Sequence, residues 1–153
     1  MRILHAADLH IDSPLRGLER YEGAPVEAMR EATRKALSNL VDYCLDESVA
    51  LLLLAGDLFD GDWRDYTTGL FFAREMSRLR EGEVKVVFTR GNHDAKSEIS
   101  KHLRLPENVY ELSTEAPQTI RFEDLGVAVH GQSFARKALT MNRHAQVLSL
   151  IHI

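Results

Sequence analysis

Three short clusters of acidic, amide and histidine side chains each follow an apolar run. The clusters are Asp8-Leu9-His10, Gly56-Asp57-Leu58-Phe59-Asp60 and Gly91-Asn92-His93-Asp94. Carboxylate, amide and imidazole groups are ligands of hard to borderline divalent metals, and a pair of such metals catalyses phosphoester hydrolysis. The clusters therefore predict a metal-dependent phosphoester hydrolase.

The first two clusters contain three candidate ligands. Asp8 and His10 are two residues apart, so in an extended chain both side chains point to one side and can bind one cation. Taken in isolation, this pair would be better explained by a capping aspartate beside a hydrogen-bonded histidine. Asp57 can bridge two metals about 3.5 to 4 Å apart, although a helix cap or an Asx turn would use the same residue. Asp60 can orient a ligand from outside the coordination sphere or begin the next turn.

The third cluster is the most specific, because an ordinary polar loop rarely combines its four residues. Gly91 permits a tight turn, and Asn92 offers an amide oxygen to a metal. His93 can donate a proton, and Asp94 can hold its imidazole in one orientation. His130 ends a later apolar run and could approach the metals from outside the coordination sphere. A hydrogen-bonded core or rim histidine is the alternative there.

The elements that must position these clusters alternate between apolar runs and amphipathic segments. The runs 2–7, 49–55 and 84–88 are typical of buried parallel strands. Pro25 suits the start of a long helix whose apolar residues recur at three- and four-residue spacing. A second helix is predicted from about Tyr66 to Arg80, and its expected inward residues are Leu70, Phe71, Met76 and Leu79. The remaining predicted elements are a helix over 98–105 and short strands at 109–112, 119–122 and 127–130.

The alternation of strands and helices predicts the α/β fold class. Strand, helix, strand, helix and strand in this order give right-handed crossovers and a parallel sheet. The carboxyl ends of parallel strands lie along one edge of the sheet. The three clusters are therefore expected to be neighbours in space.

Composition limits the remaining possibilities. With 153 residues and 44% hydrophobic content, the chain can bury one core, so we expect a single domain over 1–153. The formal charge of -4 gives no general attraction to nucleic acid, so phosphate binding would need the metals or a local basic surface. Cys44 is the only cysteine and is expected to be buried. Without a signal peptide or a run of ~20 apolar residues, we expect a soluble, cytoplasmic protein that does not bind membranes.

The ordered set Asp8-x-His10, Gly56-Asp57-x-x-Asp60 and Gly91-Asn92-His93-Asp94 resembles the calcineurin-like metallophosphoesterases. Within that superfamily, the chain is similar to the SbcD-like DNA repair exonucleases. This similarity lies in His5-Ala6-Ala7-Asp8-Leu9-His10 followed by Asp12-Ser13-Pro14, and in the segment from Gly56 to Trp63. The resemblance covers roughly residues 1–134 and is more specific for the superfamily than for the substrate.

The resemblance implies an α/β/β/α sandwich with two divalent metal ions, manganese in the family's nucleases. Asp8 and His10 would hold the first metal, Asp57 would bridge, Asn92 would hold the second, and His93 would be the catalytic acid. The implied substrate is DNA, as single strands or duplex ends, and the implied partners are a second copy and an ATPase subunit. Two alternatives remain, a phosphoesterase acting on small phosphoesters, cyclic nucleotides or phosphoproteins, and an inactive fragment.

The chain departs from the family pattern in one respect. The family also supplies a strand-end histidine and a Gly-His-x-His turn, and this sequence contains no Gly-His-x-His. By the resemblance, the first metal would lack one imidazole and the second would lack two. We therefore expect a domain that is incomplete at its C-terminus, with 143–153 as a separate tail. In that tail His152 resembles the strand-end histidine, and we interpret this resemblance as a coincidence.

Overall fold

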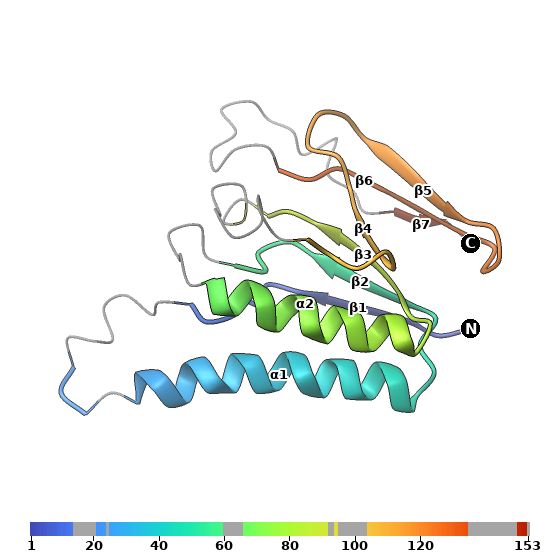
Figure 1. The fold of residues 1–153 in the computed structure, drawn as a ribbon. Helices are drawn as coiled ribbons and strands as arrows, with labels where there is room; N and C mark the ends of the chain where they lie inside the picture. The colour runs from blue at the N-terminus through green and yellow to red at the C-terminus, as the bar shows by residue number, and fades with distance from the viewer. Residues whose placement is uncertain are drawn as a thin grey trace.

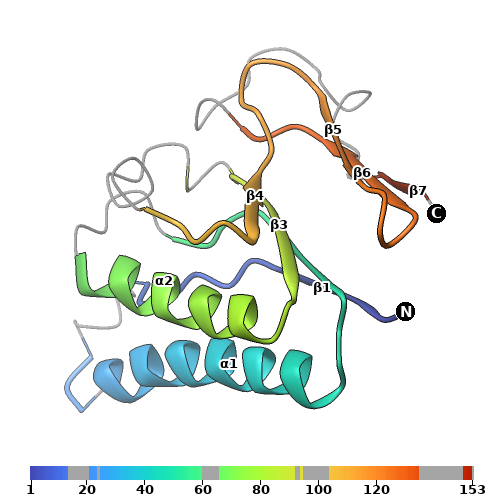
Figure 2. The ribbon, with the colours of Figure 1, turned by 45° about the vertical axis from the view of Figure 1, so that its right-hand side comes forward.

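The computed structural model describes residues 1–13, 21–23, 25–59, 66–91, 94, 104–134 and 150–152. A layer of helices, a parallel sheet and an antiparallel sheet lie on one another in that order (Figures 1 and 2). The helices are α1 (Val26–Asp46) and α2 (Tyr66–Glu81). The parallel strands are β1 (Ile3–Ala7), β2 (Leu51–Ala55), β3 (Lys85–Thr89) and β4 (Val109–Glu111); the antiparallel strands are β5 (Gln118–Phe122), β6 (Val127–Gly131) and β7 (Leu150–His152).

The parallel sheet follows the order of the sequence, β1-β2-β3-β4, and both helices cover the same face of it (Figure 2). This arrangement confirms the predicted α/β class and the parallel sheet. In its register Ala7 lies opposite Ala55, and Ala55 lies opposite Thr89. The chain therefore leaves β1, β2 and β3 at the same level, and the three polar clusters begin side by side.

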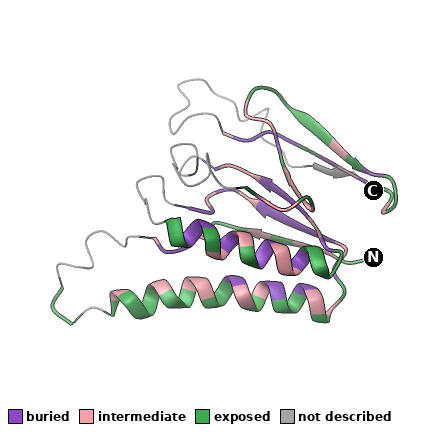
Figure 3. Ribbon diagram, in the orientation of Figure 1, coloured by how far each residue is buried: buried purple, intermediate pink, exposed green. Residues whose placement is uncertain are grey.

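Strand β2 is buried on both faces, as its wholly apolar sequence predicts. Leu52 and Leu54 belong to the core between the sheet and the helices. Leu51 and Leu53 belong to a second core against the antiparallel sheet. Figure 3 shows this burial in β2 and β3 and along the sheet-facing side of the helices. The strand that leads into Asp57 is thus buried between the two cores.

The two long predicted helices form, but the inward face of α2 differs from the prediction. Its buried stripe contains Phe72, Met76 and Leu79, whereas Leu70 is 69% exposed. The prediction for Leu70 is wrong because three consecutive apolar residues, Leu70 to Phe72, leave the phase of the stripe ambiguous. Phe71 packs at the edge of the core. On α1 the predicted burial of Cys44 is confirmed, and this burial raises the pKa of its thiol to about 11.

Three other expectations concern segments that the structure describes only in part. The predicted helix over 98–105 lies mostly outside the described residues, and the two that are described, Arg104 and Leu105, are not helical. Of the tail 143–153, only 150–152 are described, and their backbone pairs antiparallel with β6 as β7. Among the described residues, no helix covers the outer face of the antiparallel sheet. Neither described helix has the length and apolarity to cross a bilayer.

The two-sided burial of β2 predicts an unequal response to the same substitution at two leucines. Leu52→Ala should lower the free energy of unfolding by about 2–5 kcal/mol, because Leu52 is fully buried and its loss leaves a cavity. Leu70→Ala on exposed α2 surface is the matched control and should change it by less than about 0.5 kcal/mol. Urea denaturation measures both values, and equal losses would contradict the assignment of the core.

Candidate metal centre

The loop after β1 runs beside the loop after β2 and continues the hydrogen-bond ladder beyond the strands. The backbone N–H of Asp8 donates to the carbonyl of Gly56 at 3.2 Å, and that of His10 donates to Asp57 at 3.0 Å. The N–H of Ile11 donates to the Leu58 carbonyl at 2.9 Å. The first two clusters are therefore held against each other by main-chain contacts.

The backbone at the candidate ligands is left-handed. Asp8 has a φ of 55°, His10 of 42° and Asp57 of 51°. The chain at Asp8 and His10 is thus not extended, and the two side chains converge for another reason than the one the sequence suggested. Aspartate and histidine tolerate this conformation better than most residues, yet it still costs about 1–2 kcal/mol at each position. Such strain persists only where the surrounding contacts enforce it, and it is concentrated at functional sites.

Three of the predicted metal ligands come together at this edge. One ligand atom from each of Asp8, His10 and Asp57 lies within 4.8 Å of the other two. Asp8 is exposed, and the other two are half-buried. Two carboxylates and an imidazole that open toward solvent are a donor set suited to a divalent cation such as Mn²⁺ or Zn²⁺. The residues present therefore fit the metal centre predicted from the sequence.

Two glycines allow the second and third clusters to approach each other. A Cβ added at Gly91 would lie 2.0 Å from Oδ1 of Asp57 and 2.4 Å from its backbone nitrogen. A Cβ at Gly56 would lie 3.1 Å from the Cα of Gly91. The sequence suggested a glycine at 91 for a tight turn, whereas the structure requires it for this close approach. Asn92, the predicted ligand of the second metal, follows directly in the chain.

Asp94 ties the second and third clusters together. Its side chain is buried, and its carboxylate accepts hydrogen bonds from the backbone N–H groups of Leu58 (3.1 Å), Phe59 (2.7 Å) and Gly91 (2.9 Å). Burial raises the pKa of this carboxyl, and the charge of Asp57 adds to that effect, while the three N–H donors oppose it. Nothing in the sequence indicated this anchoring role, because two of the donors come from a different cluster.

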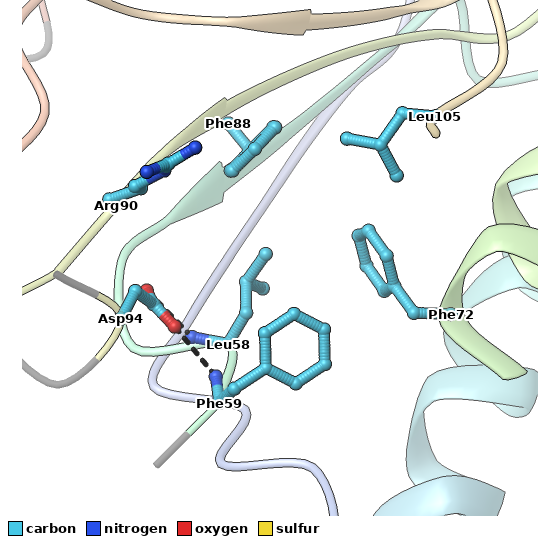
Figure 4. A pocket seen from close by; sticks show the side chains of 7 residues that line it. All are labelled: Leu58, Phe59, Phe72, Phe88, Arg90, Asp94 and Leu105. Carbon is cyan, nitrogen blue, oxygen red and sulfur yellow. Dashed lines mark hydrogen bonds between the residues drawn. The ribbon is translucent and has the colours of Figure 1, made fainter. Parts of the chain in front are cut away.

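A small, mostly apolar pocket adjoins Asp94 on the helix side of the sheet (Figure 4). Phe59 and Phe72 meet there edge to face, with their ring centroids 5.6 Å apart. Arg90 lines the pocket and forms a 2.5 Å ion pair with Glu111 on β4. The other lining residues are Leu58, Phe88 and Leu105. This apolar surrounding is the source of the desolvation of Asp94.

Among the described residues, the group that could hold a metal consists of Asp8, His10 and Asp57. Asp60, Asn92 and His93 lie outside the described residues, so their roles stay predictions. His130 is exposed on β6, where Val129 and Gly131 on either side of it are buried. Its Nδ1 lies 2.8 Å from Oγ1 of Thr119 on β5. The role of His130 near the metals also stays a prediction.

The close approach at Gly91 predicts that a single methyl group disturbs the metal centre. In Gly91→Ala the Asp57 carboxylate must move, so we expect Mn²⁺ to bind at least about tenfold more weakly. Gly126→Ala is the control: its added Cβ meets no atom within 4 Å, and its φ of 65° makes it a strained substitution far from the site. Calorimetric titration with Mn²⁺ measures both, and unchanged affinity in Gly91→Ala would argue against a metal at Asp57.

Comparison with known proteins agrees with this geometry. The calcineurin-like phosphoesterase family matches residues 1–149. The chain is 33% identical over 149 residues to the uncharacterized metallophosphoesterase YhaO of Bacillus subtilis, covering 95% of this chain and 36% of the relative. It is 32% identical over 150 residues to the DNA double-strand break repair protein Mre11 of Methanopyrus kandleri, covering 90% and 31%. It is also 32% identical over 148 residues to a subunit of the nuclease SbcCD of Rhodobacter capsulatus, covering 94% and 30%.

The chain thus spans about a third of the length of these curated relatives. Since the family match extends over nearly the whole chain, the resemblance seen in the three polar clusters is confirmed. The chain belongs to the calcineurin-like phosphoesterases.

Proposed function

We propose that the protein hydrolyses phosphodiester bonds of DNA at a dinuclear metal centre that uses manganese. The observation that carries the proposal is the convergence of Asp8, His10 and Asp57 at one sheet edge, with ligand atoms within 4.8 Å. Family membership supports hydrolysis of a phosphoester. The choice of DNA is supported by two relatives, one named as a DNA double-strand break repair protein and the other as a nuclease.

Each residue of the site has a distinct role in the proposed reaction. Asp8 and His10 would hold the first cation, Asp57 would bridge to the second, and Asn92 would bind that second cation. When bound, two such cations activate a water molecule and offset the negative charge that grows on the phosphate. His93 would protonate the departing sugar oxygen, a contribution of about 10²- to 10⁴-fold. Asp94 follows His93 directly and would fix the backbone of that loop through its three N–H donors.

One observation favours a second candidate function. The formal net charge is -4, and a negative protein gains nothing from general attraction to a polyanion. The same site could instead act on small phosphoesters, cyclic nucleotides or phosphoproteins, which need only a local contact with the metals. The inactive-fragment alternative predicts one weak Mn²⁺ site in calorimetry, whereas the enzyme needs two tight ones.

The proposed partners follow from the same resemblance. One relative is named as a subunit of the SbcCD nuclease, so by its name it is one component of a larger assembly. We propose that this protein acts as a homodimer together with an ATPase subunit, as the resemblance to the SbcD-like exonucleases implies.

A substrate comparison tests the proposed function. With Mn²⁺, we expect the protein to shorten end-labelled single-stranded or duplex DNA and to prefer it over p-nitrophenyl phosphate and cyclic AMP. Asp57→Asn should reduce DNA hydrolysis by at least about 10²-fold, because the proposed bridging carboxylate is lost. Asp124→Asn is the matched control. Asp124 lies in the turn before β6, where its exposed carboxylate pairs with Lys85 of β3. Preference for the phosphomonoester would favour the second candidate, and equal activity in Asp57→Asn would refute the site.

The proposed acid is tested separately. His93→Ala should retain Mn²⁺ binding but lower turnover by about 10²- to 10⁴-fold, because the leaving group then departs without a proton. Calorimetry measures the first quantity and initial rates of DNA hydrolysis measure the second. Undiminished turnover would exclude His93 as the acid, and loss of metal together with activity would make it a ligand instead.

A further inference from the structure

Two residues after His10, the loop that follows β1 contains a buried carboxylate with several partners. Asp12 is only 3% exposed. Nε of Arg34 donates to both of its oxygens at 2.8 and 2.9 Å, and Nη2 donates to Oδ2 at 2.6 Å. The hydroxyl of Thr68 donates to Oδ2 at 2.5 Å. The backbone N–H of Asp12 donates to Oγ1 of Thr33 at 3.1 Å.

These partners belong to both helices. Thr33 and Arg34 lie on α1, and Thr68 lies on α2, so Asp12 fastens the loop after β1 to each of them. The Arg34 guanidinium also lies over the ring of Phe71 at 5.4 Å from its centroid. A planar guanidinium with two N–H groups on one carboxylate fixes direction as well as distance. Asp12 is therefore held in position, not merely neutralised.

The loop needs support from this side because its backbone is strained. Asp8, His10 and Asp12 alternate along the loop, and all three have left-handed φ values between 42° and 55°. On one side, the N–H groups of Asp8, His10 and Ile11 are held by carbonyls of the loop after β2. On the other side, the helices hold Asp12. A left-handed conformation at residues other than glycine persists only where the surrounding contacts enforce it, and here these contacts come from both sides of the loop.

We propose that Asp12 and Arg34 are positioning residues that hold His10 in the geometry needed to bind a metal. The inference rests on the proposed metal-binding function, and it adds two residues that touch neither metal nor substrate. Asp12 is two residues from His10 and Arg34 reaches it from α1, so both act through the backbone of the loop. Outer contacts of this kind change metal affinity because they orient the ligand.

A second arginine offers a matched control for helix packing. Arg78 on α2 pairs with Asp42 of α1 at 2.5 Å and with Glu75 at 2.7 Å. It is about as exposed as Arg34, with side chains 37% and 36% accessible. Arg78 lies near the C-terminal end of α2, and its partner Asp42 lies near the C-terminal end of α1. These helix ends lead into the N-terminal ends of β2 and β3, whereas the candidate metal ligands follow the C-terminal ends of the strands. A merely structural role would make the two arginines equivalent.

The experiment compares the melting temperature and the Mn²⁺ affinity of the variants Arg34→Met and Arg78→Met. Both should lower the melting temperature, because each removes contacts that join the two helices. Only Arg34→Met should weaken Mn²⁺ binding, by about 10- to 100-fold in calorimetry. Arg34→Lys keeps the charge but loses the paired N–H groups, so it should restore part of the affinity. Equal Mn²⁺ affinity in Arg34→Met and Arg78→Met would overturn the proposal.

A second readout requires no metal. Amide hydrogen exchange at His10 and Ile11 reports whether their bonds to the loop after β2 remain closed. We expect exchange at these two amides to be at least about tenfold faster in Arg34→Met and unchanged in Arg78→Met. Unchanged exchange in Arg34→Met would overturn the positioning role. Failure of the unaltered protein to bind Mn²⁺ would instead refute the proposed function, so the two failures are distinguishable.

Discussion

The register of the parallel sheet, which aligns Ala7, Ala55 and Thr89, is the constraint on which the candidate site depends. Burial of β2 cannot set this register by itself, because Leu51 to Leu54 are identical and a slip of one residue would exchange leucine for leucine. The contacts at the strand exits distinguish the alternatives. Gly56 donates its N–H to Thr89 and accepts from Asp8, and its Cα faces Gly91. A slip would separate these partners and the candidate metal ligands with them.

The carboxylates near the site fall into two groups, a buried pair and a more exposed pair, and the two groups have different roles. Asp12 and Asp94 are buried, and each accepts at least three hydrogen bonds, of which at least two come from groups on other elements. A buried carboxylate without such donors would be costly, so these two residues serve as anchors. Asp8 is exposed and Asp57 is half-buried, and these carboxylates lie where solvent and a cation can reach them. The anchors hold the loops, and the loops carry the candidate metal ligands.

The antiparallel sheet is connected to the same edge. After β6, Ser133 donates its N–H to Ser113 at 2.8 Å and its hydroxyl to Leu112 at 2.6 Å. The same hydroxyl accepts from the N–H of Arg90 at 3.0 Å, and the carbonyl of Arg90 accepts from Phe134 at 2.9 Å. The residue that precedes the third cluster is therefore held by both sheets. Loop geometry at Gly91 thus depends on packing between the two sheets as well as on β3.

The sequence by itself determined strands β1 to β6, the two long helices and the polar clusters at the strand ends, but not β7. Apolar runs and helical spacing are local patterns, and the parallel order follows from their alternation. The sequence did not determine which face of α2 is buried, because the consecutive apolar residues Leu70 to Phe72 fit more than one helical stripe. Only the tertiary structure decided which carboxylates act as anchors and which belong to the group that could hold a metal. Asp12 and Arg34 are 22 residues apart, and Asp94 and Leu58 are 36 apart. Packing alone brings such distant partners together, and it also enforces the left-handed backbone at Asp8 and His10.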